Sequence, residues 1–176
     1  PGFVRQRGWR FVRVRPNLGD DWIAVDFLIA SGMLMPVPAL RDVGLMDADL
    51  FIDHVDTEWC LRAAHQGYRL LGTEHACFTH ELGAKRHRVW FGRMRQVSTH
   101  SPWRYYMSFR NSALLHARPY LPAPWRRANT MRLALLVGFV ALVGPNRCQA
   151  LRSMWRGWRD GRAGKFGPPP KTAELA

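Results

Sequence analysis

The first half of the chain alternates between short apolar runs and turn residues, a pattern typical of strands joined by tight loops. Basic and apolar residues alternate toward the end of residues 5–15, which predicts a half-exposed strand. The mostly apolar run WIAVDFLI, residues 22–29, predicts a buried strand. It leads into Ala30-Ser31-Gly32, where a glycine lets a backbone or a ligand approach closely. Residues 68–71 and 76–78 predict two further strands.

Helix signals separate these strands and follow them. A short helix is predicted over residues 38–43, which start with a proline and end before a glycine. A longer helix is predicted over residues 53–66, where apolar residues recur every four positions, so Trp59 belongs to the core rather than to a sugar platform. The Ser-Pro pair at residues 101–102 starts another helix that reaches about residue 116, and residues 84–100 before it are basic and irregular.

The chain changes character after residue 118. The run LALLVGFVALVG at residues 133–144 is wholly apolar, and arginines and tryptophans flank it on both sides. As a helix it would extend about 18 Å, less than the ~30 Å hydrocarbon core of a bilayer. Such flanks favour an amphipathic helix at a membrane interface. We therefore predict a catalytic part at residues 1–118, a membrane-associating helical part at 119–160 and a disordered tail at 161–176.

Composition narrows the choice of partners. The 26 Lys and Arg residues against 13 Asp and Glu leave a net charge of +13, which favours nucleic acid, an acidic lipid surface or a phosphorylated small molecule. The three cysteines are far apart and form no Cys-x-x-Cys pair, which argues against a disulfide framework or a cysteine zinc site and favours a reducing compartment. At 47% hydrophobic residues, the chain can bury a core.

Acidic residues cluster at the start of the longer predicted helix. Five of the thirteen lie within twelve positions: Asp47, Asp49, Asp53, Asp56 and Glu58. Helix capping explains the last three, with Asp53 as the N-cap, Asp56 in a capping box, and acid in the first turn favoured by the helix dipole. Spacing alone favours capping over chemistry.

The order of several blocks resembles the second half of the family-2 glycosyltransferases, most of all their rhamnosyltransferase-like branch. The blocks are the Ser31-Gly32 loop, Gly44-Leu-Met-Asp47, FIDHVDTEWCLR at residues 51–62, Gly67-Tyr-Arg69 and the HELG stretch that begins at His80. Together the resemblance covers about residues 26–111. It implies an α/β fold, the acceptor-side half of a GT-A mixed sheet with flanking helices.

The resemblance implies a role for the acidic helix start. Asp56 falls on the family's general base, and a carboxylate is needed there because a sugar hydroxyl attacks well only when its proton is drawn off. The nucleotide leaves from the opposite face, so the anomeric centre inverts. Asp53 and Glu58 would position the acceptor or support the site. Ser31 and Gly32 resemble the loop that shapes the sugar pocket, although a plain turn explains them equally well.

A divalent metal, Mg²⁺ or Mn²⁺, is also implied, with His80 completing its site; a hydrogen-bonded histidine at a strand end is the simpler interpretation. The family's Asp-x-Asp ligands come earlier in the fold. No Asp-x-Asp precedes Ser31 here, so we expect most of the donor site to be missing from this sequence.

Three arginines are candidate phosphate contacts. Arg104 and Arg110, with Asn111, match a family-like Tyr-Tyr…Arg-Asn stretch that would line a diphosphate or lipid-diphosphate path, and a solvated basic face explains them as well. Arg62 can bind phosphate or form a salt bridge on the helix surface.

The resemblance implies an inverting enzyme that transfers rhamnose from dTDP-rhamnose to a lipid-linked glycan. Its place would be peripheral, at the cytoplasmic face of the inner membrane, on an anionic lipid surface. Two alternatives stay open: an inactive membrane-surface remnant of such an enzyme, and a basic module that binds nucleic acid. The second is disfavoured, and no nucleic-acid partner is expected, because no binding motif appears and the tryptophans gather near the apolar run.

Overall fold

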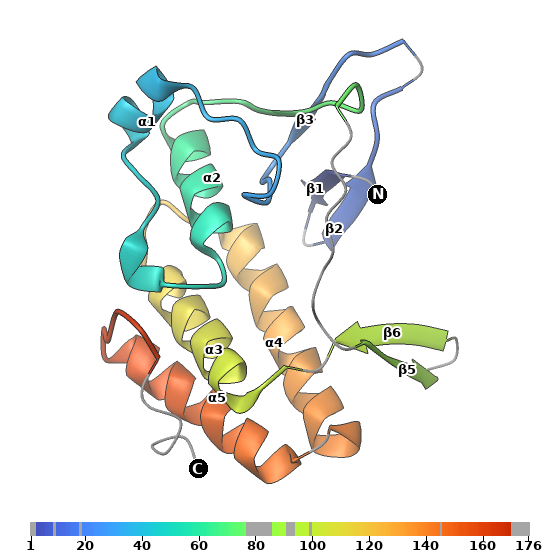
Figure 1. Ribbon diagram of the computed structural model, residues 1–176, viewed down its shortest axis with the longest axis vertical. Helices are drawn as coiled ribbons and strands as arrows, with labels where there is room; N and C mark the ends of the chain where they lie inside the picture. Colours follow the sequence, from blue (N-terminus) through green and yellow to red (C-terminus); the bar gives the residue numbers. More distant parts are fainter. Residues whose placement is uncertain are drawn as a thin grey trace.

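The computed structural model describes residues 3–8, 10–17, 19–76, 86–90, 94–98, 100–144 and 146–169, with backbone alone for residue 10 and for the strands at 86–90 and 94–98. The chain is mixed α/β, as predicted (Figure 1). The element order is β1 (Phe3–Arg7), β2 (Arg10–Val14), β3 (Ile23–Val25), α1 (Val37–Val43), the 3₁₀ turn η1 (Ala48–Leu50), α2 (Val55–His65), β4 (Leu70–Gly72), β5 (Arg86–Trp90), β6 (Met94–Ser98), α3 (Pro102–His116), α4 (Ala123–Val143) and α5 (Arg147–Arg162).

The described strands pair as antiparallel two-stranded sheets, β1 with β2, β3 with β4, and β5 with β6. The single strand predicted over residues 5–15 is wrong, because the chain reverses at Gly8, whose φ of 61° suits glycine, and Arg7 pairs with Arg10. The β5–β6 hairpin replaces the irregular stretch predicted over residues 84–100. The strand predicted at 76–78 lies largely outside the described residues.

The buried strand predicted over residues 22–29 is also wrong. Only Ile23–Val25 form β3, and Trp22 and Ile29 are 63% and 59% exposed. Beyond its pairing with β4, the segment gains one isolated bridge, between Phe27 and Val4 of β1. Because so short a ladder covers only part of the apolar run, its ends remain at the surface.

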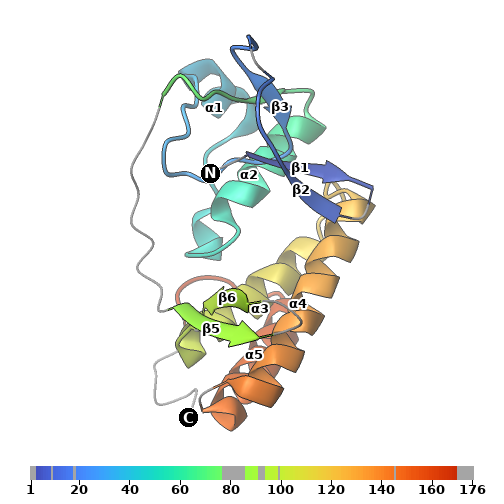
Figure 2. The same ribbon diagram turned by 90° about the vertical axis from the view of Figure 1, so that its right-hand side faces the viewer.

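Three long helices, α3, α4 and α5, form the larger body of the molecule (Figures 1 and 2). Their shared core contains Tyr105, Phe109, Leu133, Val140, Ala150 and Met154. Gly157 and Gly161 of α5 lie against the backbone of α3, so close that an added Cβ atom would overlap the carbonyls of Tyr106 and Arg110. The two glycines therefore allow α5 to pack directly on α3.

The region after residue 118 is more regular than the apolar run indicated. α4 starts ten residues before that run, since Pro122 and Pro124 occupy the N-cap and first turn, where a missing N–H costs nothing. Among the described helices, none has both the length and the apolar character needed to cross a bilayer. Residues 163–169 fold back onto η1, where the N–H of Gly167 donates to the carbonyl of Asp49 at 2.9 Å, so the disorder predicted from residue 161 does not hold for them.

Candidate active site

The loop that leads into α2 has an unusual backbone. Phe51, Asp53 and His54 have φ values of 60°, 60° and 64°, although none of them is glycine. Such conformations cost about 1–3 kcal/mol each and persist where neighbouring groups hold them. The loop is therefore a place to look for residues that fix its geometry.

Residues of α3 hold this loop. Asn111 is fully buried, and its side-chain amide donates to the carbonyls of Leu50 at 2.8 Å, of Asp53 at 3.1 Å, and of Ile52 between them. Its neighbour Arg110, 1% exposed, donates to three carbonyls, one of them shared with Asn111, and to the Asn111 side chain. The carbonyls are those of Gly167 at 2.6 Å and of Asp49 and Leu50, both at 3.3 Å. Arg110 and Asn111, expected along a diphosphate path, thus bind the backbone of the strained loop.

The capping expected at this helix start is not what the structure shows. His54 is the N-cap of α2, and no side-chain hydrogen bond caps the helix there. The Asp53 carboxylate instead accepts from the guanidinium of Arg104 at 2.9 Å. The capping prediction is wrong because the left-handed residues before α2 turn the Asp53 side chain toward α3, away from the first-turn amides.

Asp56, in the first turn of α2, lies against the turn that contains Ser31 and Gly32. Its Oδ2 atom accepts from the N–H of Ala30 at 3.2 Å, and Oδ1 accepts from the N–H of Thr57 at 2.7 Å. Ser31 and Gly32 are exposed beside it, and the φ of 85° at Gly32 requires glycine or strain. The structure therefore brings together the predicted base and the predicted pocket loop, which are 24–25 residues apart in the sequence.

Cys60 fixes the same loop one helical turn further along. The N–H of Leu28 is directed at its sulfur at 3.4 Å, so residues 56 and 60 of α2 hold residues 30 and 28 of the loop. Burial raises the pKa of the Cys60 thiol to about 11, and the nearby Asp56 and Glu58 carboxylates add to the shift. The thiol is therefore neutral at pH 7 and acts as a packing group.

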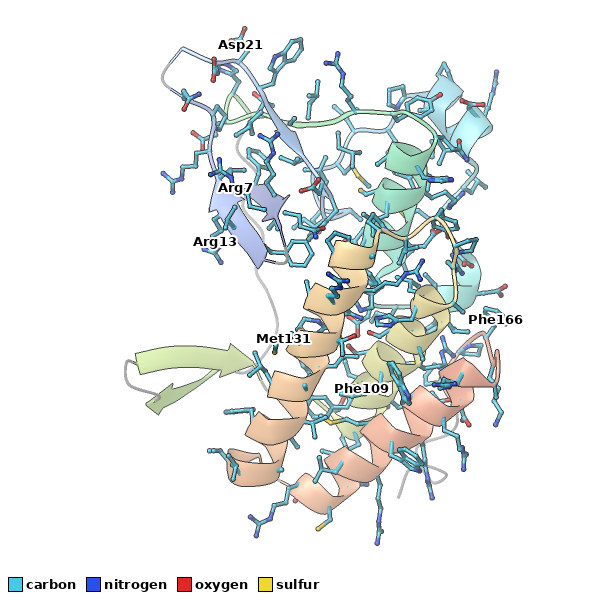
Figure 3. All side chains as sticks on the ribbon, turned by 180° about the vertical axis from the view of Figure 1, so that it is seen from behind. Arg7, Arg13, Asp21, Phe109, Met131 and Phe166 are labelled. Carbon is cyan, nitrogen blue, oxygen red and sulfur yellow. The ribbon has the colours of Figure 1, made fainter. Side chains whose placement is uncertain are left out.

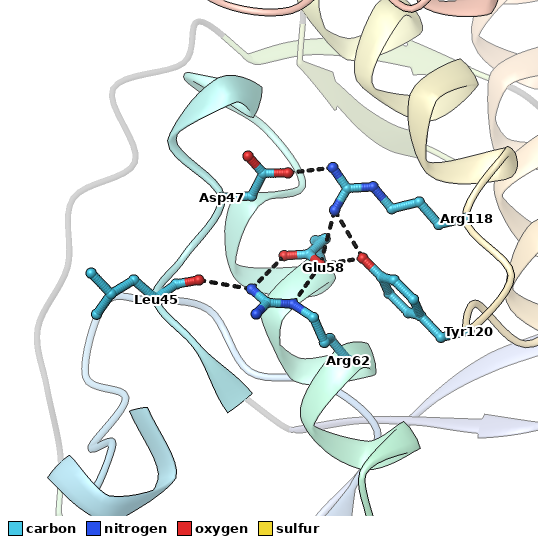
Figure 4. A pocket seen from close by; sticks show the side chains of 6 residues that line it. All are labelled: Leu45, Asp47, Glu58, Arg62, Arg118 and Tyr120. Atoms are coloured by element: carbon cyan, nitrogen blue, oxygen red, sulfur yellow. Dashed lines mark hydrogen bonds and ion pairs between the residues drawn. The ribbon is translucent and has the colours of Figure 1, made fainter. Parts of the chain in front are cut away.

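Glu58 points into a different environment. It is fully buried and binds Arg62 at 2.9 and 3.1 Å, Arg118 at 2.9 Å and the Tyr120 hydroxyl (Figure 4). Burial and the Glu58 carboxylate raise the pKa of Tyr120 to about 12, so the phenol keeps its proton and donates it. With Leu45 and Asp47, these side chains line a shallow pocket of about 280 Å³.

This network assigns Glu58 and Arg62 to structural support, one of the two interpretations that the sequence left open for each. Arg62 forms the salt bridge within its helix and also donates to the carbonyls of Val43 and Leu45. Trp59 is in the core, as predicted, 3% exposed and with its indole N–H on the Gly44 carbonyl at 2.7 Å.

A second polar group joins the loop to α3 and α4. The Nε2 atom of His54 lies 3.1 Å from the Ser112 hydroxyl and 3.2 Å from the Arg132 guanidinium, and the ring packs edge-on against Trp125. Because arginine only donates, Nε2 accepts and the ring is neutral. Burial, together with the positive charge of Arg132 and the nearby His116, lowers the pKa of His54 to about 3.

Sequence reasoning missed Arg118, Tyr120 and Arg132 as parts of this site. Arg118 and Tyr120 lie among prolines that carry no helix or strand signal, and Arg132 borders the apolar run that was interpreted as membrane-facing. Each contacts the start of α2 from sixty or more positions away in the sequence, so only the folded chain reveals the contact.

The predicted metal site is not found in the part of the chain that the structure describes. There, no group of three or more His, Cys, Asp or Glu side chains is placed to hold a metal ion. His80, the predicted ligand, lies outside the described residues.

Comparison with known proteins shows a partial similarity to a glycosyltransferase. Over 119 residues the chain is 35% identical to the dTDP-rhamnosyl transferase RfbF of Shigella flexneri. The matched stretch is 68% of this chain and 39% of that relative, so the similarity spans about two fifths of the relative's length. No family model matches the chain. No solved structure matches it.

Proposed function

We propose that this chain carries the acceptor-side half of an inverting glycosyltransferase of the GT-A type, and that Asp56 is its general base. The observation that carries the proposal is the contact between Asp56 and the turn before Ser31 and Gly32, with Oδ2 of Asp56 3.2 Å from the Ala30 nitrogen. The similarity to a dTDP-rhamnosyl transferase supports the class of reaction.

The environment of Asp56 suits proton abstraction. The donors that hold its carboxylate are the two backbone N–H groups and, at 3.4 Å, the Thr57 hydroxyl. A carboxylate offers about four lone-pair positions, so it can also accept the proton of a sugar hydroxyl during attack. Asp56 is half-buried, which leaves it reachable from solvent.

The donor in this proposal is dTDP-rhamnose, because the relative is a dTDP-rhamnosyl transferase. The acceptor is a lipid-linked glycan in bacterial surface polysaccharide synthesis, at the cytoplasmic face of the inner membrane. The bundle supports a peripheral contact with anionic lipid: Trp155, 66% exposed, lies between the exposed Arg152 and Arg159 on α5.

Of the three predicted phosphate contacts, the proposal keeps Arg104, which is 39% exposed at its side chain. A divalent metal, Mg²⁺ or Mn²⁺, remains part of the proposal through the family resemblance alone. The described residues do not supply its ligands, so no step is assigned to it.

The Asp56→Asn variant tests the base assignment. In the natural full-length protein, transfer of labelled rhamnose from dTDP-rhamnose to a lipid-linked acceptor should fall about 10²–10⁴-fold, because an amide cannot take the proton. Binding of dTDP-rhamnose should stay within twofold. Asp49→Asn, the same change at an exposed position of the same acidic cluster, is the control and should transfer normally. Transfer that persists in Asp56→Asn rejects the proposal.

A further inference from the structure

Two arginines from different helices meet at consecutive residues of the loop before α2. Arg104 of α3 binds Asp53 at 2.9 Å, and Arg132 of α4 lies 3.2 Å from the ring of His54. Arg132 also donates to the side-chain oxygen of Asn129 at 3.0 and 3.2 Å. Asn129 and the His54 ring are both uncharged, so Asp53 is the one carboxylate that binds this arginine pair among the described residues. Arg132 is exposed, and the Arg104 side chain is 39% exposed. The site therefore has surplus positive charge that solvent can reach, carried by planar groups that suit phosphate oxygens.

An apolar stripe begins beside this pair and follows α4. Met131, Leu135 and Leu142 are 51%, 67% and 71% exposed, and Ala134 and Gly138 are exposed between them. Their spacing of three and four residues places them on one face of the helix. Figure 3 shows Met131 pointing away from α3 and α5. From residue 131 to 142 the stripe extends about 16 Å at ~1.5 Å per residue.

Arg132 lies at the border between the stripe and the buried side of α4. Leu133 and Val140, on the opposite side, are 5% and 1% exposed and pack into the bundle core. The helix thus presents a cationic site at one end of an uncharged track, because residues 133–144 contain no charged side chain.

We propose that this surface binds a lipid diphosphate, with the phosphates on Arg104 and Arg132 and the hydrocarbon chain along the α4 stripe. This deepens the proposed function, on which it rests, by naming the part of the protein that holds the lipid end of the acceptor. Asp53 keeps Arg104 in place and lies three residues before Asp56, so the bound phosphates are close in the chain to the proposed base.

The shape of the charge distribution favours a lipid over the other anionic partners. A nucleic acid would need cations repeated along its backbone, whereas here the track beyond Arg132 is apolar. A nucleotide would need polar partners for its base and ribose next to the phosphates. A lipid diphosphate matches both the charged end and the apolar track.

Calorimetric titration of the chain with farnesyl diphosphate, a short lipid diphosphate, tests the proposal. Inorganic pyrophosphate, which represents its charged part, and farnesol, which represents its apolar part, are titrated for comparison. We expect farnesyl diphosphate to bind at least tenfold more tightly than either half. Arg132→Gln and Arg104→Gln should each weaken its binding about tenfold and leave farnesol binding unchanged. Leu135→Ser should weaken farnesyl diphosphate and farnesol severalfold and leave pyrophosphate unchanged.

Matched controls separate a site from general charge and general hydrophobicity. Arg41→Gln removes an exposed arginine of α1, and Leu45→Ser removes a leucine that is 75% exposed outside the stripe. Both should bind farnesyl diphosphate like the unchanged chain. Equal binding of farnesyl diphosphate and pyrophosphate overturns the proposal, as does a loss in Arg41→Gln equal to that in Arg132→Gln. The far-ultraviolet circular dichroism of each variant checks that its helices still form. Arg104→Gln and Arg132→Gln change different helices, so each tests the phosphate site separately.

The Asp56→Asn variant keeps the two proposals distinguishable. It should bind farnesyl diphosphate normally, because the hydrogen bonds of Asp56 join it to Ala30 and Thr57 and not to the arginine pair or the stripe. If the unchanged protein binds farnesyl diphosphate preferentially but transfers no sugar, the proposed function is rejected and the lipid site stands. Sugar transfer without preferential lipid diphosphate binding rejects the lipid site alone.

Discussion

Asp56 and Glu58 lie two residues apart on α2, yet their carboxylates differ in burial and in bonding partners. Glu58 is fully buried and bound by two guanidinium groups and a phenol. Asp56 is half-buried and held by backbone N–H groups and one hydroxyl, and no cationic side chain binds it among the described residues. A carboxylate whose lone pairs are all engaged stabilises the fold, whereas one with open lone pairs can accept a substrate proton.

Four arginines near the loop before α2 also fall into a structural pair and a solvent-accessible pair. Arg62 and Arg110 direct their N–H groups at groups of the protein, the carboxylate of Glu58 and backbone carbonyls around the loop before α2. Arg104 binds the Asp53 carboxylate, Arg132 donates to the uncharged side chains of Asn129 and His54, and both arginines reach solvent. Access to solvent thus separates candidate binding from support.

The largest effect on stability is expected for Glu58→Gln. Removing this charge leaves Arg62 without its counter-ion and Arg118 with Asp47 alone, which should lower the free energy of unfolding by about 3–5 kcal/mol. Urea unfolding of the chain measures the change. Glu74→Gln, at a side chain that is 51% exposed, is the control and should change stability by less than about 1 kcal/mol. If Glu58→Gln lowers the free energy of unfolding as little as the control does, Glu58 is not a structural carboxylate and the contrast with Asp56 fails.

A smaller loss is expected for Asn111→Ala. The change removes the amide that holds the carbonyls of Leu50, Ile52 and Asp53, of which Leu50 keeps the Arg110 donor, and should cost about 2–3 kcal/mol. Amide hydrogen exchange should also become faster over residues 50–56 and stay unchanged in α5. Asn17→Ala, at an exposed turn, should leave both measurements unchanged. Uniformly faster exchange over the whole chain would contradict a role specific to the loop.

The pH dependence of stability tests the neutral state of His54. Its pKa falls from 6.5 to about 3 on folding, so the unfolded chain binds the proton more readily between these values. The contribution of neutral His54 to the free energy of unfolding should therefore be complete above pH 6.5. It should decline as the pH falls, by at most about 1.4 kcal/mol per pH unit.

His54→Gln should flatten this decline between pH 6.5 and 4.5, measured by urea unfolding at each pH. Burial also lowers the pKa values of His100 and His116, so a slope of the same sign should remain. His65→Gln, at an exposed position, is the matched control and should keep the full slope. An unchanged slope in His54→Gln would show that His54 is not held neutral by the fold.

Local patterns predicted α1, α2 and α3 to within two residues at each end, because capping prolines, glycines and apolar spacing act over a single turn. They failed for β1 and β2, where one glycine reverses the chain inside an alternating run, and for the N-terminal extension of α4 across its prolines. The acidic cluster was found from the sequence. The difference between Asp56 and Glu58 was not, because it depends on Ala30, Arg118 and Tyr120, which only the fold brings to α2.

The most direct test of this account compares Asp56→Asn with Glu58→Gln in the same two assays, urea unfolding and rhamnose transfer. We predict that Asp56→Asn changes the free energy of unfolding by less than about 1 kcal/mol, since an amide oxygen still accepts from a backbone N–H, while transfer falls about 10²–10⁴-fold. If Asp56→Asn destabilises the chain as much as Glu58→Gln does, or still transfers rhamnose, Asp56 is not the base.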